Sequence, residues 1–314
     1  MKNKNIGFGG RALSFLFSAL GSLPLWLLYG IADMVAFLAG DVVGYRRNVI
    51  RENILRCFPD MSEPELKKIE KGFYHFLGDY FVETLKLGRM SAAQIEKRMK
   101  FENIEEINSL LSQGNSITAY LGHYCNWEWV SSLPLSIKTD AIAGQIYHPL
   151  ENAASDYAFL KIRSRFGAVS IDMEKVLPAL REWQREGVAS IVGYISDQAP
   201  HYHGIHYVAD FFGTETPTYT GPERLAKTFK TAVYYIDVSR PKRGYYIARF
   251  VKMSDDASKE PPFSLTQKYY DLLEASIRRA PQYWLWSHRR WKRTKEDFLR
   301  YYGEEDALRR LRRP

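Results

Sequence analysis

The chain lacks the features that mark several common protein classes. Only two of its 314 residues are cysteine, which is too few for a disulfide framework, and they do not have zinc-ligand spacing. The Gly-x-Ser-x-Gly turn of serine hydrolases is absent, and there is no internal repeat or low-complexity linker. A mean hydropathy of −0.34 excludes a polytopic membrane protein. Because 46% of the residues are hydrophobic and 25% are charged, the composition indicates an ordinary globular core.

Negative charge is also in short supply. Lys and Arg number 44 against 36 Asp and Glu, a net charge of +8 that predicts anionic partners such as lipid head groups, phosphates or nucleic acid. Much of the excess follows Trp284, where ten Lys/Arg and five Asp/Glu are mixed with tryptophans. Aromatic and basic residues together favour a membrane surface over nucleic acid. The alternative for residues 300–314 is a solvated helix.

One long apolar run lies near the N-terminus. Ala12–Ala32 has 21 uncharged residues, just long enough to cross a bilayer, whereas the next apolar patch, Met34–Gly40, is too short. Basic residues flank both sides (Lys2, Lys4 and Arg11 before, Arg46, Arg47 and Arg51 after), so they do not set an orientation. We interpret residues 1–43 as a hydrophobic membrane-associated segment with a membrane helix. The alternative is a buried helix that kinks or breaks at Pro24.

The remainder, residues 44–314, predicts an α/β fold with a central, mostly parallel sheet flanked by helices. Five β-rich runs carry this prediction, and helix-like segments separate the first four of them. The runs are 116–122, 139–147, 188–196, 232–239 and 245–252, and the helix-like segments are 126–137, 151–166, 174–186 and 221–230. We also expect an amphipathic helix over 264–280 and one charged helix over 295–313.

A possible acid–base pair follows the first predicted strand. His123 and Glu128 lie at the carboxyl end of that strand, where ligands bind in open α/β sheets. Five residues turn a helix by about 500°, so the two side chains could cooperate only with His123 in the loop and Glu128 in the first helical turn. Glu128 would then orient the ring, and the free ring nitrogen would take a proton from a hydroxyl. The alternative is a histidine that caps the helix or lies in the core.

Four sequence blocks together resemble the late acyltransferases of lipid A biosynthesis, within the glycerolipid acyltransferase superfamily. They are GHYCNWEW (122–129), ISDQAP (195–200), FFGTETPTYTGPERLAKTFKTAVYY (211–235) and APQYWLWSHRRWKRT (280–294). The resemblance covers roughly residues 40–295. It implies an enzyme that moves a fatty acyl chain from an acyl-carrier-protein or coenzyme A thioester to a hydroxyl of a lipid A precursor or related glycolipid. It also implies a cell inner membrane location, with the catalytic domain facing the cytoplasm and no cofactor.

The same resemblance assigns residues. His123 becomes the general base and Glu128 its orienting partner. Arg163, preferred over Arg165, would support the active site or the acceptor phosphate, although both could simply be exposed at a helix end. Asp197 would hold an arginine through a bidentate pair. His288, Arg289 and Arg290 would contact substrate phosphate or the carrier protein.

Other interpretations of the sequence are weaker or remain open. His201, His203 and His206 lie in a Pro/Gly-containing loop without an acidic partner nearby, so we expect no metal. Nothing local favours a thiol nucleophile at Cys125 over a small buried residue. We expect no nucleic-acid partner. The acceptor could instead be a lysophospholipid or another glycolipid, and a non-catalytic lipid-binding protein on this fold is the alternative from another class.

Overall fold

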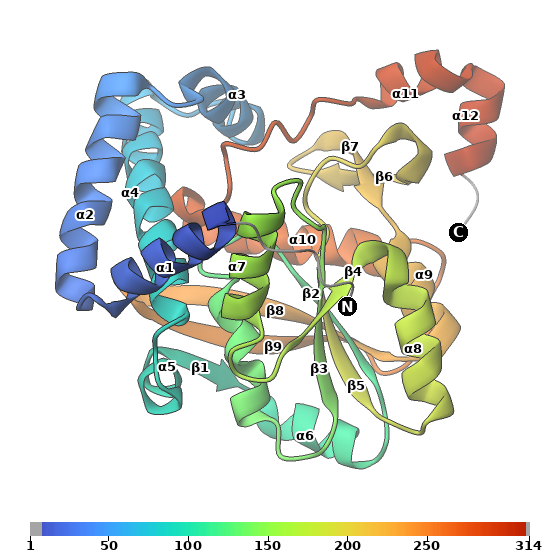
Figure 1. Ribbon diagram of the computed structural model, residues 1–314. Coiled ribbons are helices and arrows are strands. Elements are labelled where there is room, and N and C mark those ends of the chain that lie inside the picture. The colour runs from blue at the N-terminus through green and yellow to red at the C-terminus, as the bar shows by residue number, and fades with distance from the viewer. Residues whose placement is uncertain (1–7, 312–314) are drawn as a thin grey trace.

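The computed structural model describes residues 8–311, and its central element is a seven-stranded sheet in the order β1-β9-β8-β2-β5-β3-β4 (Figure 1). Every neighbouring pair is parallel except β8 and β9. The predicted mostly parallel sheet is therefore confirmed. The strands are β1 (Met99–Glu102), β2 (Ile117–Leu121), β3 (Ile142–Tyr147), β4 (Val169–Asp172), β5 (Ser190–Ile195), β8 (Ala232–Lys242) and β9 (Tyr245–Ser254).

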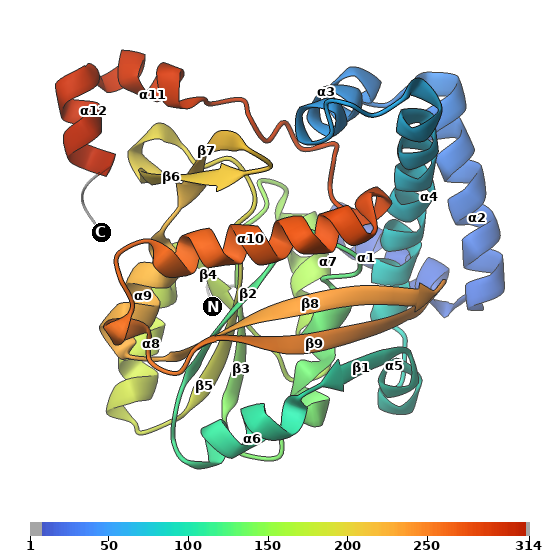
Figure 2. The ribbon, with the colours of Figure 1, turned by 180° about the vertical axis from the view of Figure 1, so that it is seen from behind.

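Helices cover both faces of the sheet. Figure 2 shows α10 crossing one face, while α7 lies on the other. Central strand β2 is buried along its whole length, as expected of an apolar parallel strand with helices on both sides. The helices around the main sheet, α7 and α10 included, are α3 (Arg47–Cys57), α4 (Glu63–Leu87), α5 (Ala92–Arg98), α6 (Ile104–Ser112), the 3₁₀ segment η2 (Trp129–Ser136), α7 (Ala153–Arg163), α8 (Val176–Arg185), α9 (Gly221–Phe229) and α10 (Ser264–Arg279).

The C-terminal third carries a small second sheet that sequence patterning did not reveal. Antiparallel strands β6 (Ile205–Phe211) and β7 (Thr214–Tyr219) pair over the carboxyl edge of the main sheet (Figure 1). The helix expected over 295–313 is two helices, α11 (Lys295–Tyr302) and α12 (Glu304–Leu311). The single-helix prediction is wrong because Gly303 adopts φ 79° between them. Arg312 and Arg313 lie outside the described residues.

Two apolar helices precede the main body. They are α1 (Phe8–Ser22) and α2 (Leu25–Phe37), and a π-helical segment, η1 (Leu38–Val43), continues α2. The apolar run Ala12–Ala32 is not one helix, because Pro24 separates α1 from α2. Within the described residues one helix is long and apolar enough to cross a membrane, Leu25–Val43, so the candidate lies farther along the chain than predicted. Lys2 and Lys4 fall outside the described residues.

Candidate active site

The site lies where two neighbouring parallel strands end. In β2 and β5, Leu121 is paired with Ile195, so the residues that follow each strand emerge at the same edge of the sheet. His123 and Asp197 each stand two residues beyond those partners. Nδ1 of His123 lies 2.6 Å from Oδ1 of Asp197, and the backbone N–H of His123 donates to Oδ2 at 2.9 Å.

Asp197 is built to remain ionised. Its side chain is only 2% exposed, and burial alone would raise its pKa. The charge of His123 and hydrogen bonds from His123 and from Nε1 of Trp284, at 2.8 Å, instead lower the pKa of Asp197 to about 2. A carboxylate only accepts, so Nδ1 of His123 must carry the proton in this pair. In the neutral ring, Nε2 then carries the lone pair that can accept a proton, on a side chain that is 18% exposed.

A second chain segment fixes the loop that carries His123. The N–H of Cys125 donates to the carbonyl of Tyr283 at 2.9 Å, and the N–H of Leu285 donates to the carbonyl of His123 at 3.1 Å. Tyr124 and Trp284 form an antiparallel bridge between these bonds. Residues 283–285 therefore hold the 123–125 loop, and Trp284 in the same segment also donates to Asp197.

Glycine is needed directly before the histidine. A Cβ at Gly122 would lie 2.6 Å from Cδ1 of Leu273 on α10 and 3.4 Å from Oδ2 of Asp197. Cys125 is fully buried with φ 52°, and burial raises the pKa of its thiol. That environment suits a packed residue rather than a thiolate nucleophile.

The partner expected for His123 is not the one found. Both carboxylate oxygens of Glu128 face Arg163, with Nε to Oε2 at 2.8 Å and Nη2 to Oε1 at 2.5 Å, and the hydroxyl of Tyr80 donates to Oε1 at 3.2 Å. Glu128 precedes η2, and its carboxylate meets α4 and α7 instead of the His123 ring. Asp197, which we expected to hold an arginine, has the orienting position, and Arg163 pairs with Glu128.

The Glu128–Arg163 pair still adjoins the histidine through aromatic side chains. Tyr80 stacks on Trp127 with ring centroids 4.2 Å apart, and Trp127 meets the His123 ring edge-on at 5.1 Å. Burial alone would lower the pKa of Arg163, but the hydrogen bonds and charge of Glu128 raise it. Arg163 is thus a permanently charged, mostly buried group that ties α7 to the loop after His123.

The two arginines expected to contact substrate behave differently from each other. Arg290 is 1% exposed, and its Nη2 donates to the carbonyl of Pro217 at 2.9 Å and the hydroxyl of Tyr270 at 3.0 Å. The guanidinium of Arg290 is enclosed by β7 and α10 and does not face an open surface, so its contact with substrate stays a prediction. Arg289 is exposed.

Two further polar residues lie near the histidine site, and sequence reasoning missed one of them, Gln198. The amide Nε2 of Gln198 lies 3.3 Å from Nε2 of His123, and Nε2 of His288 accepts from the N–H of Ala199 at 3.1 Å. Burial lowers the pKa of His288 to about 4, which keeps this second histidine neutral. Gln198 directly follows Asp197, so adjacency to a recognised motif was the available signal.

Metal-ligand groups are not present in residues 8–311, where no cluster of three or more His, Cys, Asp or Glu side chains could hold an ion. His201 and His203 stack at 5.7 Å, and Arg293 lies 3.2 Å from Nδ1 of His201. The neighbouring charge of Arg293 lowers the pKa of His201.

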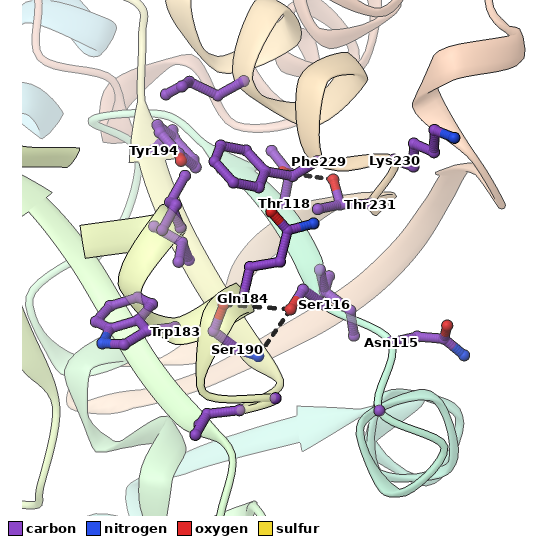
Figure 3. Close-up of a pocket in the computed structure, with 17 residues that line it drawn as sticks. Asn115, Ser116, Thr118, Trp183, Gln184, Ser190, Tyr194, Phe229, Lys230 and Thr231 are labelled. Atoms are coloured by element: carbon purple, nitrogen blue, oxygen red, sulfur yellow. Dashed lines mark hydrogen bonds between the residues drawn. The ribbon is translucent and has the colours of Figure 1, made fainter. Parts of the chain in front are cut away.

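Two cavities lie away from the histidine. One of about 200 Å³ lies at the opposite, amino-terminal ends of β2 and β5, where Figure 3 shows Ser116 beside Ser190. The other, of about 310 Å³, lies between α1, α4 and α7. Phe17, Leu85, Ala158 and Ile162 supply its apolar walls, and Arg89, Lys161 and Arg165 contribute three cations. Its walls include residues on either side of Arg163 in the sequence, Ile162 of α7 and Arg165 just beyond that helix, but not Arg163 or Glu128.

The fold and the site together define an α/β protein with a buried acid that orients a histidine base at the carboxyl ends of parallel strands, an arrangement able to activate a hydroxyl. Residues 11–293 match the family model described as bacterial lipid A biosynthesis acyltransferase. The chain belongs to this family and is an acyltransferase, acting in lipid A biosynthesis.

Named relatives agree with that assignment. The lipid A biosynthesis acyltransferase of Haemophilus influenzae is 20% identical over 277 residues, covering 87% of this chain and 84% of its own. The palmitoleoyltransferase and lauroyltransferase of lipid A biosynthesis from Escherichia coli K12 are each 22% identical. Their alignments cover 87% and 86% of this chain, and 89% and 87% of theirs.

Proposed function

We propose that the enzyme moves a fatty acyl chain from an acyl-carrier-protein or coenzyme A thioester to a hydroxyl of a lipid A precursor, with His123 as the general base. The observation that carries this proposal is the bond between Asp197 and Nδ1 of His123, which leaves Nε2 as the acceptor nitrogen. No cofactor is required, because the acceptor oxygen is itself the nucleophile.

The proton and acyl movements balance within this site. Nε2 of His123 takes the hydroxyl proton as the oxygen attacks the thioester carbonyl, and Asp197 stabilises the resulting imidazolium. The carbon–sulfur bond breaks, and the leaving thiolate recovers the proton from His123. The amide of Gln198, 3.3 Å from Nε2, must give way to the acceptor hydroxyl.

Glu128 and Arg163 act in this proposal as positioning residues. Their paired bonds hold α7 against the loop that follows His123, and Trp127 and Tyr80 transmit that packing to the ring. Two charge-assisted bonds in parallel give a fixed geometry that one bond would not give.

A phosphate of the acceptor has a fitting site in the cavity between α1, α4 and α7. Arg89, Lys161 and Arg165 are exposed at this cavity, and the ion pairs of residues 8–311 include no acidic partner for any of them. Arg163, by contrast, is already neutralised by Glu128. The apolar walls formed by Leu85 and Ile162 suit the hydrocarbon part of the same ligand.

The proposed location is the cytoplasmic face of the cell inner membrane. The exposed apolar surface of α2 supports contact with lipid, and cytoplasmic thioesters would reach the open edge of the sheet. The acyl carrier protein, or coenzyme A, is the proposed donor partner.

The test compares purified full-length wild type with His123→Ala, using an acyl-carrier-protein thioester, a coenzyme A thioester and a lipid A precursor. We expect acyl transfer to fall by roughly 10²–10⁴-fold. The matched control is His203→Ala, another histidine outside the site, which should retain activity. Lipid binding without any His123-dependent transfer would instead support the non-catalytic alternative.

A further inference from the structure

We propose that the apolar helix Leu25–Val43 lies in one leaflet of the membrane with its axis along the surface, and does not cross the bilayer. This inference rests on the membrane location proposed above and specifies how the protein meets that membrane. Length and composition alone would allow the helix to span. Its contacts with the rest of the chain argue otherwise.

The helix is packed against α4 over its whole length. Glycines allow the two backbones to approach closely, since a Cβ at Gly78 would lie 2.6 Å from the carbonyl oxygen of Ala32. Towards the C-terminal end of the helix, a Cβ at Gly40 would lie 2.7 Å from the ring of Tyr74. The preceding helix α1 also approaches α4 closely, since a Cβ at Gly21 would lie 2.5 Å from the carbonyl oxygen of Leu85. The contacts of Gly78 and Gly40 place α2 antiparallel to α4, as both ribbon views show (Figures 1 and 2).

Charged groups line the same interface at mid-helix. Asp33 is bound by Arg243 through Nη2 at 2.7 Å and Nη1 at 3.0 Å, and by Nδ1 of His75 at 3.2 Å. Arg243 also contacts Asp79 of α4. If the helix crossed the bilayer, this cluster would lie at hydrocarbon depth, where ionisable side chains are strongly disfavoured.

The surrounding elements cannot follow α2 into lipid. α4 carries Asp79 and Glu83 along this interface, and Arg240 and Arg243 come from the β8–β9 hairpin. Glu83 binds the hydroxyls of Tyr29 on α2 and Tyr246 on β9 and the amide of Asn126 beside the active site. Crossing would therefore require either burying part of the catalytic body in lipid or breaking its polar core.

The opposite face of the helix matches a lipid surface. Trp26 is 75% exposed and Val43 is 73% exposed, and the other exposed apolar residues include Phe37 and Val42. An exposed apolar surface of this size marks a membrane or protein contact, and the tryptophan near one end suits the head-group region. Cations stand at both ends, Arg46 at one and Arg89 of α4 at the other, where anionic head groups would meet them. Asp41 is exposed near the end of the helix, where interfacial water would reach it.

Site-specific labelling distinguishes lying from crossing. Single cysteines are introduced in the full-length protein by Ser22→Cys and Tyr45→Cys, exposed positions at the two ends of the helix, and by Asp255→Cys on the catalytic body as the control. The native cysteines are buried with raised pKa values, so they give a low background. An impermeant maleimide is added to oriented inner-membrane vesicles of either sidedness.

We expect all three cysteines to react from the same side. Reaction of Ser22→Cys and Tyr45→Cys from opposite sides would overturn the inference. Acyl transfer by the same variants is measured separately, so active protein with opposite-side labelling rejects only the interfacial placement. If His123→Ala transfers acyl chains as fast as wild type does, only the proposed chemistry is rejected.

Vesicle flotation tests the lipid-facing residues. The aspartate variants Phe37→Asp and Val42→Asp should reduce recovery on phosphatidylethanolamine–phosphatidylglycerol vesicles by at least about tenfold, because a charge would enter the apolar layer. Tyr301→Asp, an exposed apolar position on α11, is the matched control and should float as wild type does. Undiminished flotation of both helix variants would contradict the proposed surface.

Discussion

The carboxylate of Asp197 accepts two hydrogen bonds from His123, one from ring Nδ1 at 2.6 Å and one from the backbone at 2.9 Å. The acid therefore fixes both the ring and the peptide that carries it. A change at Asp197 should alter the orientation of the base as well as the stability of its protonated form.

Asp197→Asn should lower the turnover number by roughly 10²–10⁴-fold while the protein remains folded, because the amide is similar in size but removes the charge that stabilises the imidazolium. Steady-state kinetics checks the rate, and circular dichroism checks the fold. Trp284→Phe is the graded comparison, since it removes only one donor to Asp197, at 2.8 Å. Equal activity of Asp197→Asn and wild type would remove the acid from the mechanism.

His288 should make stability depend on pH. Its pKa falls to about 4 in the folded protein from an ordinary 6.5, so the folded state disfavours protonation. The stabilisation by neutral His288 is then complete above pH 6.5 and is lost as the pH falls from 6.5 towards 4. At pH 5 the loss should be about 1 to 2 kcal/mol. Denaturant unfolding at pH 7.5 and pH 5 measures it, and His288→Asn should show a smaller difference between the two.

Arg290→Ala should destabilise the protein by about 2 to 4 kcal/mol, because it empties a buried position and strands the carbonyl of Pro217. Arg289→Ala, the exposed neighbour, should leave the free energy of unfolding within about 0.5 kcal/mol of wild type. Parallel urea titrations of the two variants provide the comparison. Similar stability of both would contradict the structural role given to Arg290.

Neutralising the cavity cations with Arg89→Gln, Lys161→Gln and Arg165→Gln together should raise the KM for the acceptor by at least about tenfold with little change in kcat, since charge-assisted phosphate contacts contribute about 1.5–3 kcal/mol each. The KM for the thioester should not change. Arg224→Gln, on exposed α9, is the control. A selective fall in kcat would place these cations in the chemistry instead of in acceptor binding.

Sequence patterning predicted the central strands because their apolar runs are long and bounded by turns. It missed β1 and β4, since four-residue strands at the sheet edges carry little periodic signal. The β6–β7 hairpin was hidden for a different reason, because its sequence is polar and contains histidine and proline. Helix boundaries followed Pro24, but sequence alone did not reveal the break at Gly303.

The structure places His123 at the carboxyl end of a strand, as the sequence predicted, but pairs it with Asp197 instead of Glu128. His123 was recognisable from a local motif, whereas the acid that binds it stands 74 residues later. Their contact depends on the register between β2 and β5, a tertiary property that spacing within one motif cannot express. Glu128 was predicted to be the partner of His123 because it is close in sequence. Its backbone position instead directs its side chain to Arg163.

The β-bridge between Tyr124 and Trp284 has a consequence for synthesis of the protein. The base, its acid and the segment that holds the histidine loop come from three separate stretches of the chain, at His123, Asp197 and Tyr283–Leu285. A ribosome-bound chain that has exposed only residues up to about the end of β9 already contains the base and its acid. It still lacks residues 283–285, which hold the loop that carries His123. Release at that stage should yield a fragment without acyl-transfer activity, because the residues that hold the His123 loop, Tyr283–Leu285, are still missing.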